Sequence, residues 1–438
     1  MIDILNPFGN RSSYCLCIGI DWGHSKNSIH MIASQSDRIE HCAVDADPAS
    51  MRSFIDSLRK RFPEGKMLVA SEQSKGALTN LLLDFDFVVP MAVNPHSAAK
   101  FRRSLHPSGS KSDPIDSSAL LRMLFTHKDR MAQAKRLDDQ SQRLDVIGRH
   151  RRLIVEQRVE VALRLRSLLR EYYPQCLPML GPEIWNPISL AFLKKWPCYS
   201  KLLKAKQDTL RRFYYANGSR SKCSVEKRLS ELGKSDVLSS DPLLEELGEL
   251  RMRSFVEQIS MLEKQIRQIE KTLQSCFRDH PDKEIFASLA GAGPAMAPRL
   301  AAAFGTDRGR YASCEQLQAY VGIAPIQVQS GNCNYTFMRR FCPKFLRQSF
   351  HEWAGLSIQH SAWAKACYEM LRERGKRVGE AKRALAFKWI RILYKCWISK
   401  TPYDETKHLE NLRKTNSPVI AKMQEMNLIK NENILFYT

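Results

Sequence analysis

Long apolar runs are missing from this sequence of 438 residues, and so are paired cysteines. No run of about 18 apolar residues could span a bilayer, and "MIDILNPFGNRSSY" lacks the basic start and apolar middle of a signal peptide. The 12 cysteines include no C-x-x-C pair, which argues against a zinc finger and a disulfide framework. Only Cys15 and Cys17 lie close together, in a strand-like run that should point both into one core. We expect a cytosolic protein with reduced, mostly buried thiols.

Acidic residues are scarce relative to basic ones. Lysine and arginine total 68 and aspartate and glutamate 46, so the formal net charge is +22. Such an excess indicates a polyanionic partner. Nucleic acid is the leading candidate, although an anionic membrane surface would also attract this chain. The length suggests two or three domains, enough for a sizeable core.

The first part of the chain alternates between strand and helix patterns. Between residue 15 and about residue 127, short apolar runs such as "CLCIGIDW", "KMLVASE" and "FVVPMAVN" alternate with amphipathic segments such as "PASMRSFIDSLRKRF". This order predicts a mixed α/β layer, with strands at 15–22 and 27–34 joined as a hairpin. We predict four parts in all: an α/β domain, 1–130; a helical and coiled-coil region, 131–284; a mainly helical domain, 285–400; and a polar tail, 401–438.

Two apolar stripes mark long helices in the middle of the chain. One lies in a basic segment at 135–173, and the other steps by three and four residues from Met252 to Leu273. An antiparallel hairpin within one chain would bury both stripes, and so would a homodimer. The sequence does not choose between them, and we favour some intermolecular use. Between them, 174–240 predicts short helices and a mobile linker around "YYANGSRSKCS".

The region from residue 285 onward is predicted to be helical except around 321–342. It opens with "FASLAGAGPAMAPRLAAAFG", a glycine-rich turn between two helical stretches. Backbone amides near Gly291 and Gly293 could bind a phosphate at the start of the second helix. Small residues also let two helices pack closely, which is the alternative. We favour phosphate binding because the chain is so basic. The tail after about residue 400 shows one short helix pattern and no assignable function.

Four acids stand at places where carboxylates could meet. Asp21 and Glu72 each end a predicted strand, and their side chains converge if the two strands are neighbours in one sheet. In "KSDPIDSSALLRM", Asp113 and Asp116 lie three residues apart on one face of a helix that Ser112 or Asp113 would cap. Capping alone explains one aspartate, but four crowded carboxylates need a counter-charge. Divalent metal supplies it, so the pattern indicates metal-dependent phosphoryl transfer.

Several segments in order resemble one known family, the DEDD transposases of insertion sequences, described as bridge-RNA-guided recombinases. The resemblance covers roughly residues 15–397. It is carried by "GIDWGHSKN", "ASEQSKGAL", "VNPHSAAKFRRS", "KSDPIDSSALL", "LAGAGPAMAPRLAAAFG", "LQAYVGIAPIQVQSGN" and "AWAKACYEMLRERGKRVGEAKRALAFKWIRILY". It implies a resolvase-like, RNase H-like domain followed by a transposase domain. The chain departs from the family where Ser117 replaces an alanine and where "EQSKG" surrounds the glutamate.

The resemblance also implies site residues and partners. The family's acids correspond to Asp21, Glu72, Asp113 and Asp116, which would hold Mg²⁺ or Mn²⁺. Ser330, before Gly331 in "VQSGN", corresponds to the serine that attacks the DNA phosphodiester, although by its local sequence it is more typical of a turn. The implied partners are donor and target DNA, a structured bridge RNA and further copies of the chain, a dimer assembling to a tetramer. The implied location is the bacterial nucleoid.

Three basic residues complete the predicted site. Lys111 precedes the helical acids, and Arg339 and Arg340 follow Ser330 in "MRRFCPKFLR", where they would suit contacts to a nucleic-acid backbone. A solvated surface is the alternative for the two arginines. The leading hypothesis is a DNA recombinase. A metal-dependent junction-resolving nuclease that uses water, and a binding scaffold without catalysis, are the two other hypotheses.

Overall fold

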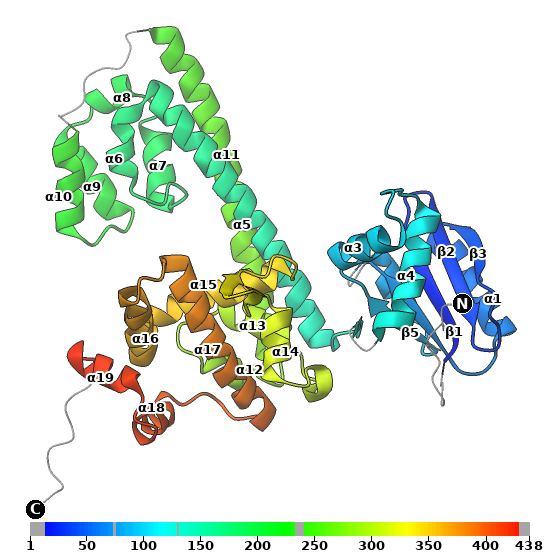
Figure 1. Ribbon diagram of the computed structural model, residues 1–438. Helices are drawn as coiled ribbons and strands as arrows, with labels where there is room; N and C mark the ends of the chain where they lie inside the picture. Colours follow the sequence, from blue (N-terminus) through cyan, green and yellow to red (C-terminus); the bar gives the residue numbers. More distant parts are fainter. Residues whose placement is uncertain (1–13, 73–75, 129–130, 233–240, 429–438) are drawn as a thin grey trace, which may run out of the picture. The chain divides into compact units, whose positions relative to one another are not determined.

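The computed structural model describes residues 14–72, 76–128, 131–232 and 241–428, so most of the N-terminal segment that bears on a signal peptide lies outside them. The chain divides at Leu137 into two compact units, each with its own core (Figure 1). Among the described residues, no helix is both long enough and apolar enough to cross a membrane.

A six-stranded mixed sheet forms the centre of the first unit, in the order β3-β2-β1-β4-β5-β6. β1 pairs antiparallel with β2 and parallel with β4, and β5 continues the parallel part. The predicted hairpin and α/β layer are therefore confirmed. The strands are β1 (Tyr14–Asp21), β2 (Lys26–Ala33), β3 (Glu40–Asp45), β4 (Lys66–Ser71), β5 (Val88–Ala92) and β6 (Ala132–Gln133).

Helices cover both faces of this sheet. α1 (Pro48–Arg61) and α2 (Ala77–Leu82) pack on one face, and α3 (Pro95–Leu105) and α4 (Asp113–His127) pack on the other. The prediction that Cys15 and Cys17 share one core is wrong. The pairing of β1 with β4 is irregular between Tyr14 and Leu16, so the alternation of side chains is interrupted there. Cys15 consequently packs on the α1 side and Cys17 on the α4 side.

Two long helices dominate the start of the second unit, α5 (Asp139–Tyr172) and α11 (Pro242–Arg278) (Figure 1). They run antiparallel, because Arg151 bonds to Glu270 whereas Arg158, further along α5, bonds to the earlier Glu263. The stripe residue Ile266 is only 4% exposed and packs in a cluster with Ile154 of α5. The apolar contact between α5 and α11, which we call the seam, is therefore formed within one chain. The intermolecular use that we favoured for this stripe is wrong.

A small helical layer lies between the two long helices in sequence. Its core packs against α5 and α11. The segment "YYANGSRSKCS" ends one helix and begins the next, with a short turn at 217–221 rather than the expected linker. The helices are α6 (Leu177–Leu180), α7 (Pro187–Lys195), α8 (Tyr199–Leu203), α9 (Gln207–Ala216) and α10 (Lys222–Glu231), preceded by a 3₁₀ turn, Pro174–Cys176.

The rest of the second unit is helical around a tryptophan-rich core, with one β-hairpin. The hairpin strands are β7 (Ile326–Ser330) and β8 (Cys333–Phe337). The helices are α12 (Lys283–Ala287), α13 (Met296–Phe304), α14 (Cys314–Tyr320), α15 (Lys344–His360), α16 (Ala362–Glu373), α17 (Val378–Ser399), α18 (Glu405–Lys414) and α19 (Pro418–Glu425), with a 3₁₀ turn, Arg308–Arg310.

The predicted polar tail is a packed part of this core. Tyr403 accepts a hydrogen bond of 2.8 Å from the Trp363 indole, and Met423 of α19 is fully buried. Two helices, not one, lie between residue 400 and the last described residue, Leu428. The sequence did not reveal this because the tail's apolar side chains are spread through a mostly polar segment and pack on a core that other segments build.

Replacing Ile266 with aspartate should destabilise the second unit without changing the mass of the particle. A carboxylate would be buried in the α5–α11 seam without a partner, at a cost of about 3 kcal/mol or more. Thermal unfolding and light scattering measure the two effects. Gln265→Asp is the matched control, because Gln265 is exposed on the same helix. A lower mass in Ile266→Asp with the control unchanged would mean that the seam joins two chains.

Candidate active site at the sheet edge

Asp21 and Glu72 stand at the ends of two neighbouring parallel strands. β1 and β4 pair in register up to Ile20 and Ser71, so Asp21, the last residue of β1, and Glu72, the residue after β4, lie at the same end of the two strands. The predicted convergence of these two strand ends is confirmed. Both side chains are half-buried. Residues 73–75, which complete the "EQSKG" segment after Glu72, lie outside the described residues.

Gly19 lets the helix with the other two acids lie directly on β1. A Cβ atom built at Gly19 would stand 2.3 Å from the Ser117 carbonyl oxygen and 2.4 Å from the Leu121 nitrogen, both in the α4 backbone. Such distances are impossible for a side chain, so only glycine allows this approach. Asp113 and Asp116 occupy the first turn of α4, as predicted from "SDPID". Ser112 is the N-cap by position, but its side chain makes no capping hydrogen bond.

Hydrogen bonds behind the acids fix α4 against β2. The Ser117 hydroxyl lies 2.9 Å from Ser28 Oγ and 2.8 Å from His30 Nδ1. His41 stacks 4.4 Å from His30, centroid to centroid, and contacts Ser28. Ser117, the residue that departs from the family pattern, therefore anchors the helix that carries Asp113 and Asp116.

The four carboxyl groups influence one another electrostatically. The pKa of Asp21 is raised to about 6, first by burial and then by the negative charges of Asp116, Asp113 and Glu72. The pKa of Glu72 is also raised, by burial and by Asp116. Lys111 opposes both shifts, which shows that its positive charge lies near the acids. The four residues therefore share one electrostatic site.

Arg102 supplies a counter-charge within this site. Its guanidinium bonds to the Asp116 carboxylate at 2.5 Å, and both side chains are largely buried. The same arginine also acts against the raised pKa of Glu72. In the described part of the chain, no three His, Cys, Asp or Glu side chains converge as a ready ligand set for a metal ion. Asp116 is paired with Arg102 instead.

The glycine-rich turn before α13 has a packing role at one of its two glycines. Gly291 has a φ of 72°, and a Cβ there would stand 2.9 Å from the backbone of Leu356 and Ser357 in α15. The close-packing alternative therefore explains Gly291. Gly293 is exposed, and a Cβ atom there would meet nothing within 4 Å, so its phosphate-binding role stays a prediction.

Ser330 lies at the tip of the β7–β8 hairpin in the second unit. It pairs with Cys333 across the two-residue turn Gly331–Asn332, in which Gly331 has a φ of 56°. Both strands are exposed along their whole length. The Ser330 hydroxyl has no hydrogen-bond partner within the residues that the structure describes.

The two arginines that follow the hairpin differ in their surroundings. Arg340 is exposed, as a backbone-binding residue would be, whereas Arg339 is half-buried. The Arg339 carbonyl accepts a 2.8 Å hydrogen bond from Arg347, and the Arg339 Nε atom is buried without a partner among the described atoms. Arg339 is therefore partly a structural residue of the turn between β8 and α15.

Sequence reasoning missed Arg102 and Gly19, although both have recognisable signals. Arg102 lies in "KFRRS", a segment whose only evident signal was its resemblance to the family. The helix that carries Arg102, α3, packs against α4. Gly19 interrupts an apolar strand, and an isolated glycine in a strand often marks the close approach of another backbone.

These features define an RNase H-like α/β domain with an acid cluster at the edge of its sheet, followed by a helical unit with an exposed serine. Comparisons with known proteins agree with this class. Residues 18–174 match a family model described as "Transposase", and residues 283–369 match one described as "Transposase IS116/IS110/IS902 family". The chain belongs to this family of insertion-element transposases.

Individual relatives extend the match over nearly the whole chain. A mini-circle putative transposase for IS117 from Streptomyces coelicolor is 27% identical over 91% of this chain and 97% of its own length. An insertion element IS110 uncharacterized 43.6 kDa protein from the same organism is 21% identical over 86% of this chain and 92% of its own. An IS900 uncharacterized 42 kDa protein from Mycobacterium paratuberculosis is 29% identical over 32% of this chain and 35% of its own.

Gly19→Ala should disrupt the acid cluster by pushing α4 off β1. The clash is with backbone atoms, which cannot rotate away, so the first unit should lose about 1–3 kcal/mol or more of unfolding free energy. Chemical denaturation followed by circular dichroism measures this loss. Gly379→Ala is the control, because a Cβ there meets nothing within 4 Å. Equal stability of both variants would contradict the close approach of α4.

Asp21→Asn should stabilise the metal-free first unit at neutral pH and leave it unchanged near pH 4. The folded pKa of Asp21, about 6, lies above its unfolded value, so the folded state holds the proton longer and stability falls as pH rises between these values. The amide carries no charge and escapes this loss. Thermal unfolding in EDTA at pH 4 and pH 7.5 measures the difference. A wild type that is the more stable protein at pH 7.5 would refute the mutual repulsion.

Proposed function

We propose that this transposase recombines DNA through a covalent serine intermediate. In this proposal Ser330 is the nucleophile, the four acids hold Mg²⁺ or Mn²⁺, and a structured RNA selects donor and target DNA by base pairing. The observation that carries the catalytic part is the electrostatic coupling of Asp21 to Glu72, Asp113 and Asp116 at one sheet edge. Such a cluster is costly unless a cation neutralises it.

The donor set suits a hard divalent cation. The four groups are carboxylates, which supply the oxygen ligands that Mg²⁺ prefers. The pKa values of Asp21 and Glu72 are raised, first by burial and then by neighbouring carboxylates, although Lys111 acts against both shifts and Arg102 against that of Glu72. Bound metal would stabilise negative charge on the phosphate that reacts. Because Arg102 holds Asp116, metal binding requires this carboxylate to exchange its guanidinium partner for the ion, or to share it.

The chemistry assigned to Ser330 is an exchange of one phosphodiester for another. The serine oxygen forms a bond to phosphorus, the bond from phosphorus to one DNA oxygen breaks, the serine proton passes to solvent, and the leaving oxygen takes up a proton. A DNA hydroxyl reverses these steps when the strands rejoin. Bond energy is conserved, so no further energy source is needed.

The hairpin has properties that suit a nucleophile used only in an assembled complex. Ser330 is exposed, and its hydroxyl lacks a described activating partner. The strands also expose large apolar side chains, of which Tyr335 and Phe337 are each more than half exposed. Two strands alone are marginally stable in water. These facts support the proposal that a homo-oligomer, a dimer or tetramer, brings the acids of one subunit to the serine of another.

A metal-dependent nuclease that activates water is the second candidate. The lack of a described hydrogen-bond partner for the Ser330 hydroxyl favours it, since an unactivated serine is a weak nucleophile. The two candidates differ in one product. Water leaves free DNA ends, whereas Ser330 leaves DNA attached to protein.

Ser330→Ala should abolish a protein–DNA adduct that survives denaturation, together with the recombinant product. One oxygen is lost from an exposed position, so folding and RNA binding should be unchanged. The adduct is measured on a denaturing gel with labelled DNA, the copurifying RNA and Mg²⁺. Cys333→Ala is the matched control, because Cys333 faces Ser330 across the same turn. An adduct in Ser330→Ala would place the nucleophile elsewhere, and cleavage by the wild type without any adduct would favour the nuclease.

A further inference from the structure

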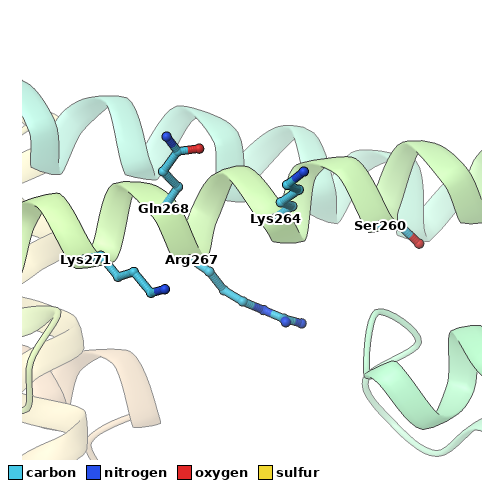
Figure 2. Close-up of a pocket in the computed structure, with 5 residues that line it drawn as sticks. All are labelled: Ser260, Lys264, Arg267, Gln268 and Lys271. Atoms are coloured by element: carbon cyan, nitrogen blue, oxygen red, sulfur yellow. The ribbon is translucent and has the colours of Figure 1, made fainter.

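A shallow pocket lies along one face of α11 in the second unit. Its volume is about 390 Å³, and all of its lining residues belong to this one helix (Figure 2). They are Ser260, Lys264, Arg267, Gln268 and Lys271. Their spacing of three, four and seven residues places them on one face, and each turn of the helix adds a side chain to it. We refer to these five residues as the α11 face.

This face lies on the side of α11 opposite the apolar seam. Ile266 and Leu262 point into the seam with α5 and are almost fully buried. Lys264, Arg267 and Lys271 are exposed. In Figure 2 the side chains of Arg267 and Lys271 extend from the helix on the side away from α5. The α11 face is therefore open to a partner.

Two acids of α11 that lie near this face in the sequence are used on the other side of the helix. Glu263 bonds to Arg158 at 2.5 Å, and Glu270 bonds to Arg151 at 2.6 Å, both across the seam. Lys264, Arg267 and Lys271 have no ion-pair partner in the described part of the chain, and no acid lines the pocket. The charges between α5 and α11 thus compensate one another. Lys264, Arg267 and Lys271 lie without a paired acid on the face of α11 that points away from α5.

We propose that the α11 face binds the phosphate backbone of double-stranded DNA. Seven residues of α-helix rise about 10.5 Å, so the row from Lys264 to Lys271 meets several phosphates of one duplex. Gln268 and Ser260 add hydrogen-bond donors for phosphate oxygens.

The lining residues also discriminate between kinds of nucleic acid. Single strands are bound by stacking on aromatic rings, and the α11 face has none. A duplex presents a continuous double row of phosphates, which needs only cations and polar donors. DNA rather than duplex RNA is the occupant because the chain belongs to a transposase family. This assignment concerns a surface that holds DNA and does not depend on Ser330 being the nucleophile.

The test is duplex DNA binding by the full chain with Lys264, Arg267 and Lys271 changed together to glutamine. Fluorescence anisotropy with a labelled duplex of arbitrary sequence, over a series of salt concentrations, should show affinity weakened by about tenfold or more. The slope of log affinity against log salt should shrink by about 2.7, because each lost phosphate contact removes about 0.9. Circular dichroism should show an unchanged fold, since all three side chains are exposed.

A matched variant controls for the loss of three charges. Lys407, Arg413 and Lys414 on α18 are also two lysines and one arginine, exposed and without a described ion pair, so their change to glutamine should leave the slope nearly unchanged. Equal effects of the two triple variants would overturn the proposal, because the effect would then be one of net charge. Loss of affinity for duplex RNA alone would overturn the assignment to DNA. Because the readout is duplex binding and not strand exchange, failure of the serine mechanism stays distinguishable.

Discussion

The contact between α4 and β1 at Gly19 is the constraint on which the acidic site depends. Asp113 and Asp116 reach the edge that bears Asp21 only because the α4 backbone lies directly on the strand. Ser117 secures the same helix from the other side through Ser28 and His30. A residue that departs from the family pattern thus has a structural role, and it leaves the four acids in place.

Charged side chains are balanced differently in the two units. At the sheet edge, burial and the negative charges of three neighbouring carboxylates raise the pKa of Asp21, and Lys111 and Arg102 offset part of the negative charge. Along the α5–α11 pair, arginines and glutamates neutralise each other across the seam, and the excess positive charge lies on the outer face of α11. The net charge of +22 is therefore not spread evenly. A phosphodiester partner would meet cations on a helix and a cluster of carboxylates at the sheet.

Much of the architecture was readable from local patterns, since strand ends, helix starts and the apolar stripes of α5 and α11 are properties of neighbouring residues. Four carboxylates at predicted element ends indicated a shared site before any geometry was known. The features that the sequence did not reveal depend on contacts between residues that are far apart in the chain. The bulge that separates Cys15 from Cys17 is set by pairing with β4, and the Arg102–Asp116 bond joins two helices. The tail packs through residues such as Tyr403 and Met423 on a core that distant segments build. The apolar stripe that contains Ile266 was equally compatible with packing inside one chain and with packing between two chains, because apolar side chains do not specify which chain supplies the partner helix.

The central claim is that Asp21, Glu72, Asp113 and Asp116 act as one metal-binding site. Calorimetric titration of Mn²⁺ into the full chain, compared with titration into each single acid-to-amide variant, tests it most directly. The account predicts that the wild type binds Mn²⁺ and that each of the four substitutions weakens this binding, whereas Asp84→Asn, at a surface pair with Arg52, leaves it unchanged. A wild type that binds no Mn²⁺, or binding that survives the loss of Asp21 or Asp116, would contradict it.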